Sequence, residues 1–312
     1  MRRSAVVADS RLPARAGLAL SLLLLWSGHA AAQTLDEQQI EQGRSVGAGT
    51  GGWDATLGAG LALRPVYEGA DDHRIGFAPM GMITYDHGWF FAGPAGIGLN
   101  LAPLPGLRIG PVLGFLGGRK EDVDSQLNGL GDIAPSLTAG VFASYRMGQF
   151  RLGGTVRQAI THQANGLYGN LTLDWIKPLP QQHLVFDIGP AIDFANGSYN
   201  RTFFGVSPQQ SEQSGYILPS PFAPLPPQAG LPAYTPSGGV KDVAFNAVLN
   251  YQLSQHWLLR SFAGVQLLVG PDGNSPIVQS KVQDFIGAGV EYHFGSGPMP
   301  MAGGAAGGAG QP

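Results

Sequence analysis

Apolar and polar residues alternate along most of this chain. From Trp53 to Phe294 the sequence falls into segments of about ten residues in which every second position is apolar and uncharged. In the segment 53–64, one set of alternate positions is Trp, Ala, Leu, Ala, Leu and Leu, and the other is Asp, Thr, Gly, Gly, Ala and Arg. Successive side chains of a strand point to opposite faces. The pattern therefore predicts strands with one apolar and one polar face.

Eleven segments follow this pattern. They are 53–64, 76–85, 89–101, 106–116, 132–145, 149–160, 166–176, 183–194, 240–251, 257–269 and 283–294. On ten of them the apolar face can be assigned, and it holds no Asp, Glu, Lys or Arg, which is what a lipid-facing surface requires. The opposite face carries charges of both signs. We predict that eight of these face a lumen: Arg108, Arg151, Arg157, Asp174, Asp187, Asp193, Arg260 and Glu291.

A soluble sandwich would show the same alternation, because one face of each sheet is buried and the other is wet. Aromatic residues at the segment ends favour a membrane instead. Tyr85 and Trp89 flank one short turn, and Tyr251 and Trp257 flank another, as expected of rings at the headgroup level. A sheet in hydrocarbon must close on itself to pair its backbone. We therefore predict an all-β fold, an antiparallel transmembrane β-barrel.

The connections predict the two ends of the barrel. Short turns near 86–88, 146–149, 177–182 and 252–256 suit the periplasmic side, and longer segments suit the external side. These longer segments are 65–75, 117–131, 195–239 and 270–282. Turns on one side must be separated by an even number of strands, yet three lie between Trp89 and Tyr145. Either a strand is hidden in 117–131, which gives twelve strands, or one is spurious, which gives ten; we favour twelve.

The chain ends indicate export. Four arginines precede an apolar run from Gly17 to Trp26 and the small residues Ala30 to Ala32, which is typical of a signal peptide cleaved between Ala32 and Gln33. We expect residues 1–32 to be this peptide, 33–52 a flexible arm, 53–294 the barrel and 295–312 a disordered Gly/Ala tail.

The composition of the chain excludes one class of partner and some kinds of secondary structure. Removal of the signal peptide leaves 14 basic and 20 acidic residues, which argues against nucleic acid as a partner. The chain has no cysteine, and no segment is long and apolar enough for a transmembrane helix. The prolines of 207–239 exclude a paired strand there and predict an extended external loop.

No catalytic constellation emerges from the sequence. The seven histidines match no metal-ligand spacing, and we expect no catalytic, cofactor-binding or metal-binding residues and no cofactor. Glu291 and His293 share one face of the last strand and could form an acid–base or metal pair, but hydrogen bonds to neighbouring strands are the simpler expectation.

Several short patterns, in order along the chain, resemble the MipA/OmpV family of outer-membrane proteins (MltA-interacting protein-like). The residues that carry the resemblance are Pro65, Tyr67, Gly69, Asp71, Gly118, Arg119, Gly129, Asp132, Phe204, Gly205, Ser275, Pro276, Ile277 and Val278. The run Asn274 to Val278, one strand before a terminal aromatic strand, is the most specific.

The resemblance implies a non-enzymatic barrel in the outer membrane of a Gram-negative cell. It implies a murein (peptidoglycan) scaffold that holds a periplasmic lytic transglycosylase near a murein synthase. It also implies that Tyr292 and Phe294 form the signal read by the barrel-assembly machinery, although eighteen residues follow Phe294 here. Partner contact is expected in the periplasmic turns and the N-terminal arm.

Two other functions remain open at this stage. A lumen with charges of both signs could be a porin-like small-solute channel or a plug of salt bridges. The long loop 207–239 could instead make the protein an adhesin or a surface ligand-binding protein.

Overall fold

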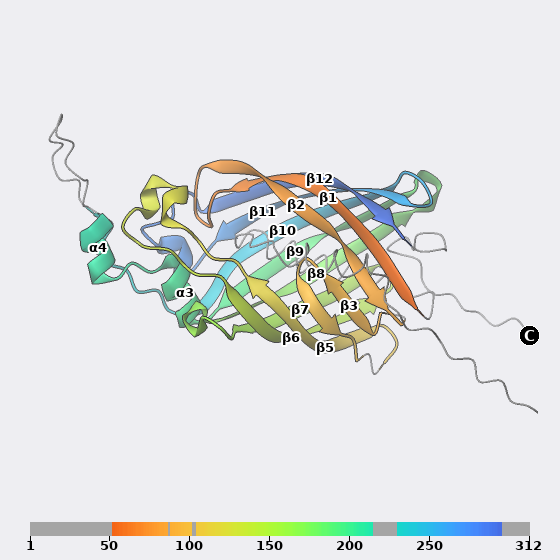
Figure 1. The fold of residues 1–312 in the computed structure, drawn as a ribbon, viewed down its shortest axis with the longest axis horizontal. Helices are drawn as coiled ribbons and strands as arrows, with labels where there is room; N and C mark the ends of the chain where they lie inside the picture. The colour runs from red at the N-terminus through yellow and green to blue at the C-terminus, as the bar shows by residue number, and fades with distance from the viewer. Residues whose placement is uncertain (1–51, 87, 102–103, 215–229, 295–312) are drawn as a thin grey trace, which may run out of the picture.

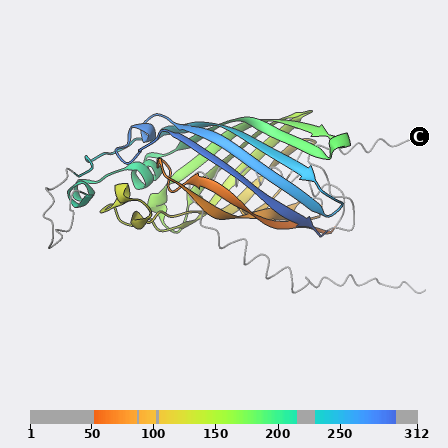
Figure 2. The same ribbon diagram turned by 90° about the horizontal axis from the view of Figure 1, so that it is seen from above.

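The computed structural model describes residues 52–86, 88–101, 104–214 and 230–294. Twelve antiparallel strands close into a barrel in which β1 pairs with β12. Figures 1 and 2 show this barrel from two directions. The strands are β1 (Trp53–Pro65), β2 (His73–Tyr85), β3 (Phe90–Gly93), β4 (Gly96–Leu99), β5 (Leu107–Leu116), β6 (Ser136–Met147), β7 (Phe150–Ala159), β8 (Leu167–Leu179), β9 (Leu184–Ala195), β10 (Gly239–Gln252), β11 (Trp257–Leu268) and β12 (Val282–His293). The predicted all-β barrel of twelve strands is confirmed.

The alternation of the sequence becomes the two faces of the wall. On β1, Leu61 points outward and is 60 % exposed, whereas Thr56 and Arg64 point inward and are buried. Outward apolar side chains continue around the barrel through Phe245 and Ile286, which are about as exposed. No helix in the described part of the chain is long and apolar enough to cross a membrane.

The additional strand needed for twelve lies in the segment 89–101 and not in 117–131, where it was expected. The predicted segment 89–101 is a short hairpin, β3 and β4, because Pro94 and Ala95 turn the chain back. Gly96 adopts φ +126°, a conformation that glycine tolerates and L-residues rarely adopt. The strand expected within 117–131 is wrong, since that segment holds two 3₁₀ helices, η1 (Glu121–Val123) and η2 (Ser125–Leu127).

The connections differ at the two ends. Short turns, including η4 (Pro180–Gln182), join strands at the end where β1 begins, and we call this end the rim. Long connections occupy the opposite end. They contain η1, η2, η3 (Gln163–Asn165), α3 (Gly197–Phe204), α4 (Pro208–Ser214) and η5 (Asp272–Asn274).

Helix α3 was not predicted, and the extended loop expected at 207–239 is wrong at its start, where α4 forms. The Asn196 side chain caps α3 by accepting a hydrogen bond from the Tyr199 amide at 3.0 Å. The proline run of that loop lies within 215–229, outside the described residues, as do the predicted signal peptide, nearly all of the arm and the tail.

Candidate functional site

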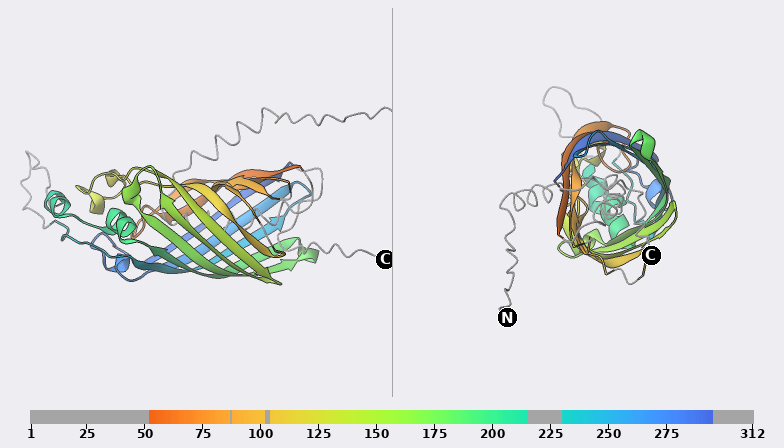
Figure 3. Two further views of the ribbon diagram at one scale, coloured as in Figure 1. Left: turned by 90° about the horizontal axis from the view of Figure 1, so that it is seen from below. Right: turned by 90° about the vertical axis from the view of Figure 1, so that its right-hand side faces the viewer.

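The long connections fold together over one end of the barrel and form what we call the cap. Thirteen buried residues make its core: Tyr67, Ala70, Leu116, Leu127, Leu130, Tyr168, Ala195, Tyr199, Phe203, Phe204, Val206, Leu268 and Ile277. They come from loops, from helix α3 and from strand ends that are far apart in the sequence. In the end-on view of Figure 3, the teal segment with α3 and α4 lies within the outline of the ring. The cap is therefore a small hydrophobic core that covers this mouth of the barrel.

Tyr67 ties the first loop to the last. Its hydroxyl donates to the Ile277 carbonyl at 2.8 Å and also bonds the Gln279 side chain at 2.9 Å, while its ring is 1 % exposed. Burial raises the pKa of Tyr67, so its hydroxyl stays protonated and able to donate. Gly69 has φ +104°, and a Cβ there would lie 2.9 Å from Val278. The glycine thus allows the two loops to approach closely.

A second set of contacts ties α3 to its neighbours. The Ser275 hydroxyl donates to the Phe204 carbonyl at 2.6 Å, and the Arg119 guanidinium donates to the Phe203 carbonyl at 2.7 Å. These bonds satisfy carbonyls at the end of α3, which the helix itself leaves without partners. Burial lowers the pKa of Arg119 to about 10, which still leaves it charged near neutral pH.

The remaining residues of the predicted motif also lie in or beside the cap. Gly118 passes so close to the Ile133 carbonyl that a Cβ would lie 2.1 Å from it, and Gly129 packs on Gln213. The Asp132 carboxylate accepts from the Glu121 amide at 3.0 Å. Pro65 ends β1, Asp71 follows in the same loop, Gly205 ends α3, and the Pro276 carbonyl accepts from Gln126. The motif residues, which were assigned from separate short patterns in the sequence, thus lie together in or beside the cap.

Sequence reasoning missed a charged cluster at the base of the cap. Lys241 pairs with Glu68 and lies 2.9 Å from Asp242, and Gln266 donates to both carboxylates. Asp272 is fully buried nearby, and neither of its carboxylate oxygens has a hydrogen-bond partner among the described residues. Burial, and then the charge of Glu68, raise the pKa of Asp272 to about 8. The only sequence signal was the presence of Glu68 inside the motif around Tyr67.

Below the cap, inward charges pair across neighbouring strands. Arg151 on β7 lies 3.0 Å from Asp174 on β8 and 2.8 Å from Asp187 on β9. Arg260 on β11 lies 3.0 Å from Glu291 on β12. All five side chains are less than a tenth exposed. These charged side chains are therefore paired and buried inside the barrel.

The other predicted lumen residues lie apart from these pairs. Arg157 donates to the Ala95 carbonyl at 3.0 Å, Arg108 is half-buried on β5, and Asp193 sits opposite Asp242 in the β9–β10 register. Glu291 and His293 do not pair with each other. His293 contacts Asp54 at 2.8 Å, so the acid–base pair considered from sequence does not form. No group of three or more His, Cys, Asp or Glu side chains in the described ranges is arranged to hold a metal ion.

Aromatic residues cluster at the rim. The rings of Trp53 and Tyr85 lie 4.8 Å apart, and Tyr292 contacts both Trp257, at 5.0 Å, and Phe294, at 4.9 Å. The Phe294 amide donates to the Ala55 carbonyl, which continues the seam between β1 and β12. The two residues predicted as the assembly signal therefore stand in this belt of rings.

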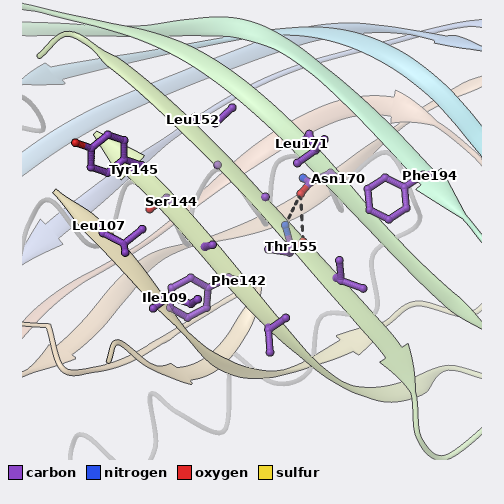
Figure 4. Close-up of a pocket in the computed structure, with 15 residues that line it drawn as sticks. Leu107, Ile109, Phe142, Ser144, Tyr145, Leu152, Thr155, Asn170, Leu171 and Phe194 are labelled. Carbon is purple, nitrogen blue, oxygen red and sulfur yellow. Dashed lines mark hydrogen bonds between the residues drawn. The ribbon is translucent and has the colours of Figure 1, made fainter. Parts of the chain in front are cut away.

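The outer wall carries an apolar groove of about 390 Å³ across β5 to β8 (Figure 4). Leu107, Ile109, Leu152, Gly154 and Leu171 are among the residues that line it. Its lining is almost wholly apolar, as suits a surface in contact with lipid.

Comparison with solved structures gives only distant likenesses. The Pseudomonas putida toluene transporter TodX is 10 % identical with a TM-score of 0.37, and the match covers 86 % of this chain and 94 % of that one. An anion-selective porin from Comamonas acidovorans is 9 % identical with a TM-score of 0.35, covering 78 % and 98 %. Pseudomonas putida OprB is 11 % identical with a TM-score of 0.36, covering 70 % of this chain and 59 % of that one. These values are too low to carry an argument about function.

No curated protein matches this sequence. A family model does match, and it spans residues 57–294, which is almost the whole barrel and cap. The chain is an outer-membrane β-barrel that belongs to the family described as MltA-interacting protein MipA.

Proposed function

We propose that this protein is a non-enzymatic scaffold in the outer membrane for periplasmic murein enzymes, such as a lytic transglycosylase and a murein synthase. The observation that carries the proposal is the family match over residues 57–294, because that family is named for an interaction with MltA. The fold alone would not specify this role, since barrels serve many functions.

The buried ion pairs of the interior support a scaffold over a channel. The Arg151 and Arg260 ion pairs are buried in the lumen, and the cap covers the external mouth. An open, water-filled pore would leave such side chains exposed. We expect no discrete current steps in planar bilayers that contain the purified protein. Reproducible steps would favour the small-solute channel.

The periplasmic rim offers a candidate contact surface. Leu101 and Leu104, in the β4–β5 turn, are 56 % and 63 % exposed. Exposed apolar side chains that gather on one short turn suit a protein interface, where they become buried. We place the partner contact at this turn.

The test is a pull-down of purified periplasmic murein hydrolases and synthases by the full chain in detergent. An unrelated barrel of similar size serves as the control. We expect enrichment, and we expect Leu104→Asp to reduce it while Gln182→Asp, in another exposed turn, leaves it unchanged. Recovery no greater than that of the unrelated barrel would refute the scaffold.

We further infer how the chain reaches its place. Residues 1–32 act as a signal peptide cleaved between Ala32 and Gln33, 33–52 form an arm, and 295–312 form a tail. The assembly machinery reads Tyr292 and Phe294. The intact mass of the mature protein tests the cleavage, and Phe294→Ser is expected to lower the yield of folded barrel more than Val240→Ser.

A further inference from the structure

The barrel wall is incomplete beside β2. All thirteen residues of β2 pair with β1, but only Ile83, Thr84 and Tyr85 pair with β3. The β3–β4 hairpin turns back after four residues, and in Figure 1 β2 extends well beyond it. Within the described ranges, residues 73–82 therefore have a paired strand on one side only. We call this stretch the upper edge of β2.

The residues of this edge fit an unpaired position in a membrane. The Asp86 amide donates a hydrogen bond to the Gly52 carbonyl. In this register the backbone N–H and C=O groups of even-numbered β2 residues point toward β1, and those of odd-numbered residues point toward the edge. Pro79 is one of these and has no amide hydrogen, and prolines within sheets are confined to such edges. Ile75 and Phe77, which are 71 % and 62 % exposed, lie in the same stretch.

The upper edge lies at the depth of the outer leaflet. Phe77 is eight residues above Tyr85 in the aromatic rim. At 3.3 Å per residue and the usual strand tilt, Phe77 stands about 20 Å above the rim, in an apolar band about 25 Å tall. Ile75 and Phe77 therefore face hydrocarbon, whereas Pro79, Gly81 and Ile83, which lie lower on the same outward face, are buried.

The inner surface behind the edge is apolar, unlike the rest of the lumen. Two adjoining clusters meet along β2 at Ala78, Met80 and Met82, and we call them together the inner belt. The other members are Ala62, Val248, Phe262 and Phe285 in one cluster, and Phe91, Ala95, Val112 and Phe142 in the other. All eleven are buried and none carries a charge. Methionine side chains are flexible and adapt to irregular apolar partners.

Two contacts join the short hairpin to the inner wall: Phe91 packs edge-on against Phe142 at 5.5 Å, and Arg157 bonds to the hairpin turn. Arg157 crosses the inner wall from β7 and reaches the Ala95 carbonyl at the hairpin turn. Gly140 and Gly114 lie beneath it, and a Cβ on either would collide with Arg157 at 2.9 Å or less. The wall beside β2 is thus closed by side chains and by a short hairpin, not by a continuous ladder.

We propose that the wall between the upper edge of β2 and the β3–β4 hairpin is a lateral entrance, through which a hydrocarbon chain of an outer-leaflet lipid reaches the inner belt. The occupant follows from the chemistry. Acyl chains reach the outer side of the entrance at Ile75 and Phe77, and the eleven side chains of the inner belt are all apolar, with Arg157 the one charged group that reaches them, at Ala95. This binding role goes beyond the scaffold and does not depend on it.

The test uses the full chain in vesicles that contain a phospholipid with a diazirine in the middle of one acyl chain. After illumination, labelled residues are mapped by mass spectrometry. We expect adducts on the inward residues Met80 and Met82 as well as on outward Phe77. Thr172, inward on the far wall, should carry none. Labels confined to outward residues would overturn the proposal.

A reversible disulfide between β2 and β3 tests whether labelling depends on opening of the wall at this place. The chain has no cysteine, and Met82 and Gly93 form the next pair in the β2–β3 register. Opposite residues of antiparallel strands lie about 4.5–5.5 Å apart at Cα, which suits a disulfide. In the variant Met82→Cys/Gly93→Cys, oxidation should abolish labelling of Met80, and reduction should restore it, while Phe77 stays labelled in both states.

The matched control is Ser144→Cys/Gly153→Cys, a paired position on β6 and β7 away from the entrance. Its oxidation should leave labelling of Met80 and Met82 unchanged. Heat-modifiable gel migration establishes that both variants are folded barrels. Equal labelling of Met80 in the locked and reduced states of a folded barrel would contradict a lateral entrance at this place.

Discussion

The two ends of this barrel are stabilised in different ways. At the cap, loops from all along the chain bury Tyr67, Phe204 and Ile277 completely and join them by side-chain to backbone hydrogen bonds. At the rim, short turns leave Trp257 and Tyr85 about half exposed, in contact mainly with other rings. Substitutions at the cap should therefore act through loss of packing, and those at the rim through the membrane interface.

The largest expected effect is at the centre of the cap. Phe204→Ala removes a fully buried ring and leaves a cavity, which typically costs about 3–5 kcal/mol. We expect that loss in the local free energy of opening, measured by amide hydrogen exchange in α3 and in residues 275–279. Exchange in β7 and β8 should not change. Equal loss of protection in those strands would mean that the cap and barrel are one cooperative unit.

The second-largest effect is expected from the hydrogen bond between the loop that holds Tyr67 and the loop that holds Ile277. Tyr67→Phe keeps the ring but removes the hydroxyl that donates to the Ile277 carbonyl. A buried acceptor left without its donor costs about 1–3 kcal/mol. Limited proteolysis within 269–281 should become faster. Ser280→Ala is the control, because it removes only a solvent-exposed hydrogen bond to the Val282 carbonyl in the same loop and should have little effect.

The cap should also weaken as pH rises. The pKa of Asp272 is about 8 in the folded cap against an ordinary value of 3.8, so the folded state binds one more proton between these values. Stability is therefore greatest below about pH 4 and falls towards pH 8, by at most about 1.4 kcal/mol per pH unit. Hydrogen exchange in the cap, corrected for its intrinsic pH dependence, should show this slope. Asp272→Asn should remove it, and an unchanged slope would assign it to another group.

The smallest effect is expected at the rim. Trp257→Ala removes a half-exposed ring that contacts Tyr292 edge-on, an interaction worth about 0.5–1.5 kcal/mol beyond its burial. We expect a slightly lower temperature for loss of the folded gel band and no change of protection in the cap. Trp257→Phe should restore most of the difference. A loss of stability as large as that caused by Phe204→Ala would show that the rim and the cap are not stabilised in different ways.

The strands were predictable because each strand residue faces either lipid or the interior. Leu61 and Phe245 are outward, and Arg151 and Asp174 inward, so the two environments select residues with period two. The hairpin of β3 and β4 escaped this rule, since Phe91 and Ile97 keep the alternation across Pro94 and Ala95. Only the tertiary pairing shows that the chain turns back there.

The cap was predictable in its residues but not in its arrangement. The motif positions around Tyr67, Phe204 and Ile277 were recognised one loop at a time, by resemblance. Helix α3 does not follow the alternation that predicts strands, although Asn196 before Tyr199 is a helix-capping signal. The pairing of Lys241 with Glu68 joins residues 173 positions apart, and no local pattern encodes such a contact.

By itself the sequence determined that this chain forms a closed sheet with an uncharged outer face, short turns at one end and long loops at the other. That information is local, because lipid or water acts on each side chain separately. Only the tertiary structure decided that the inward charges are paired and buried, that the loops share one core, and that a short hairpin stands beside β2. These features depend on distances between remote segments, which are set when the barrel closes and β1 meets β12.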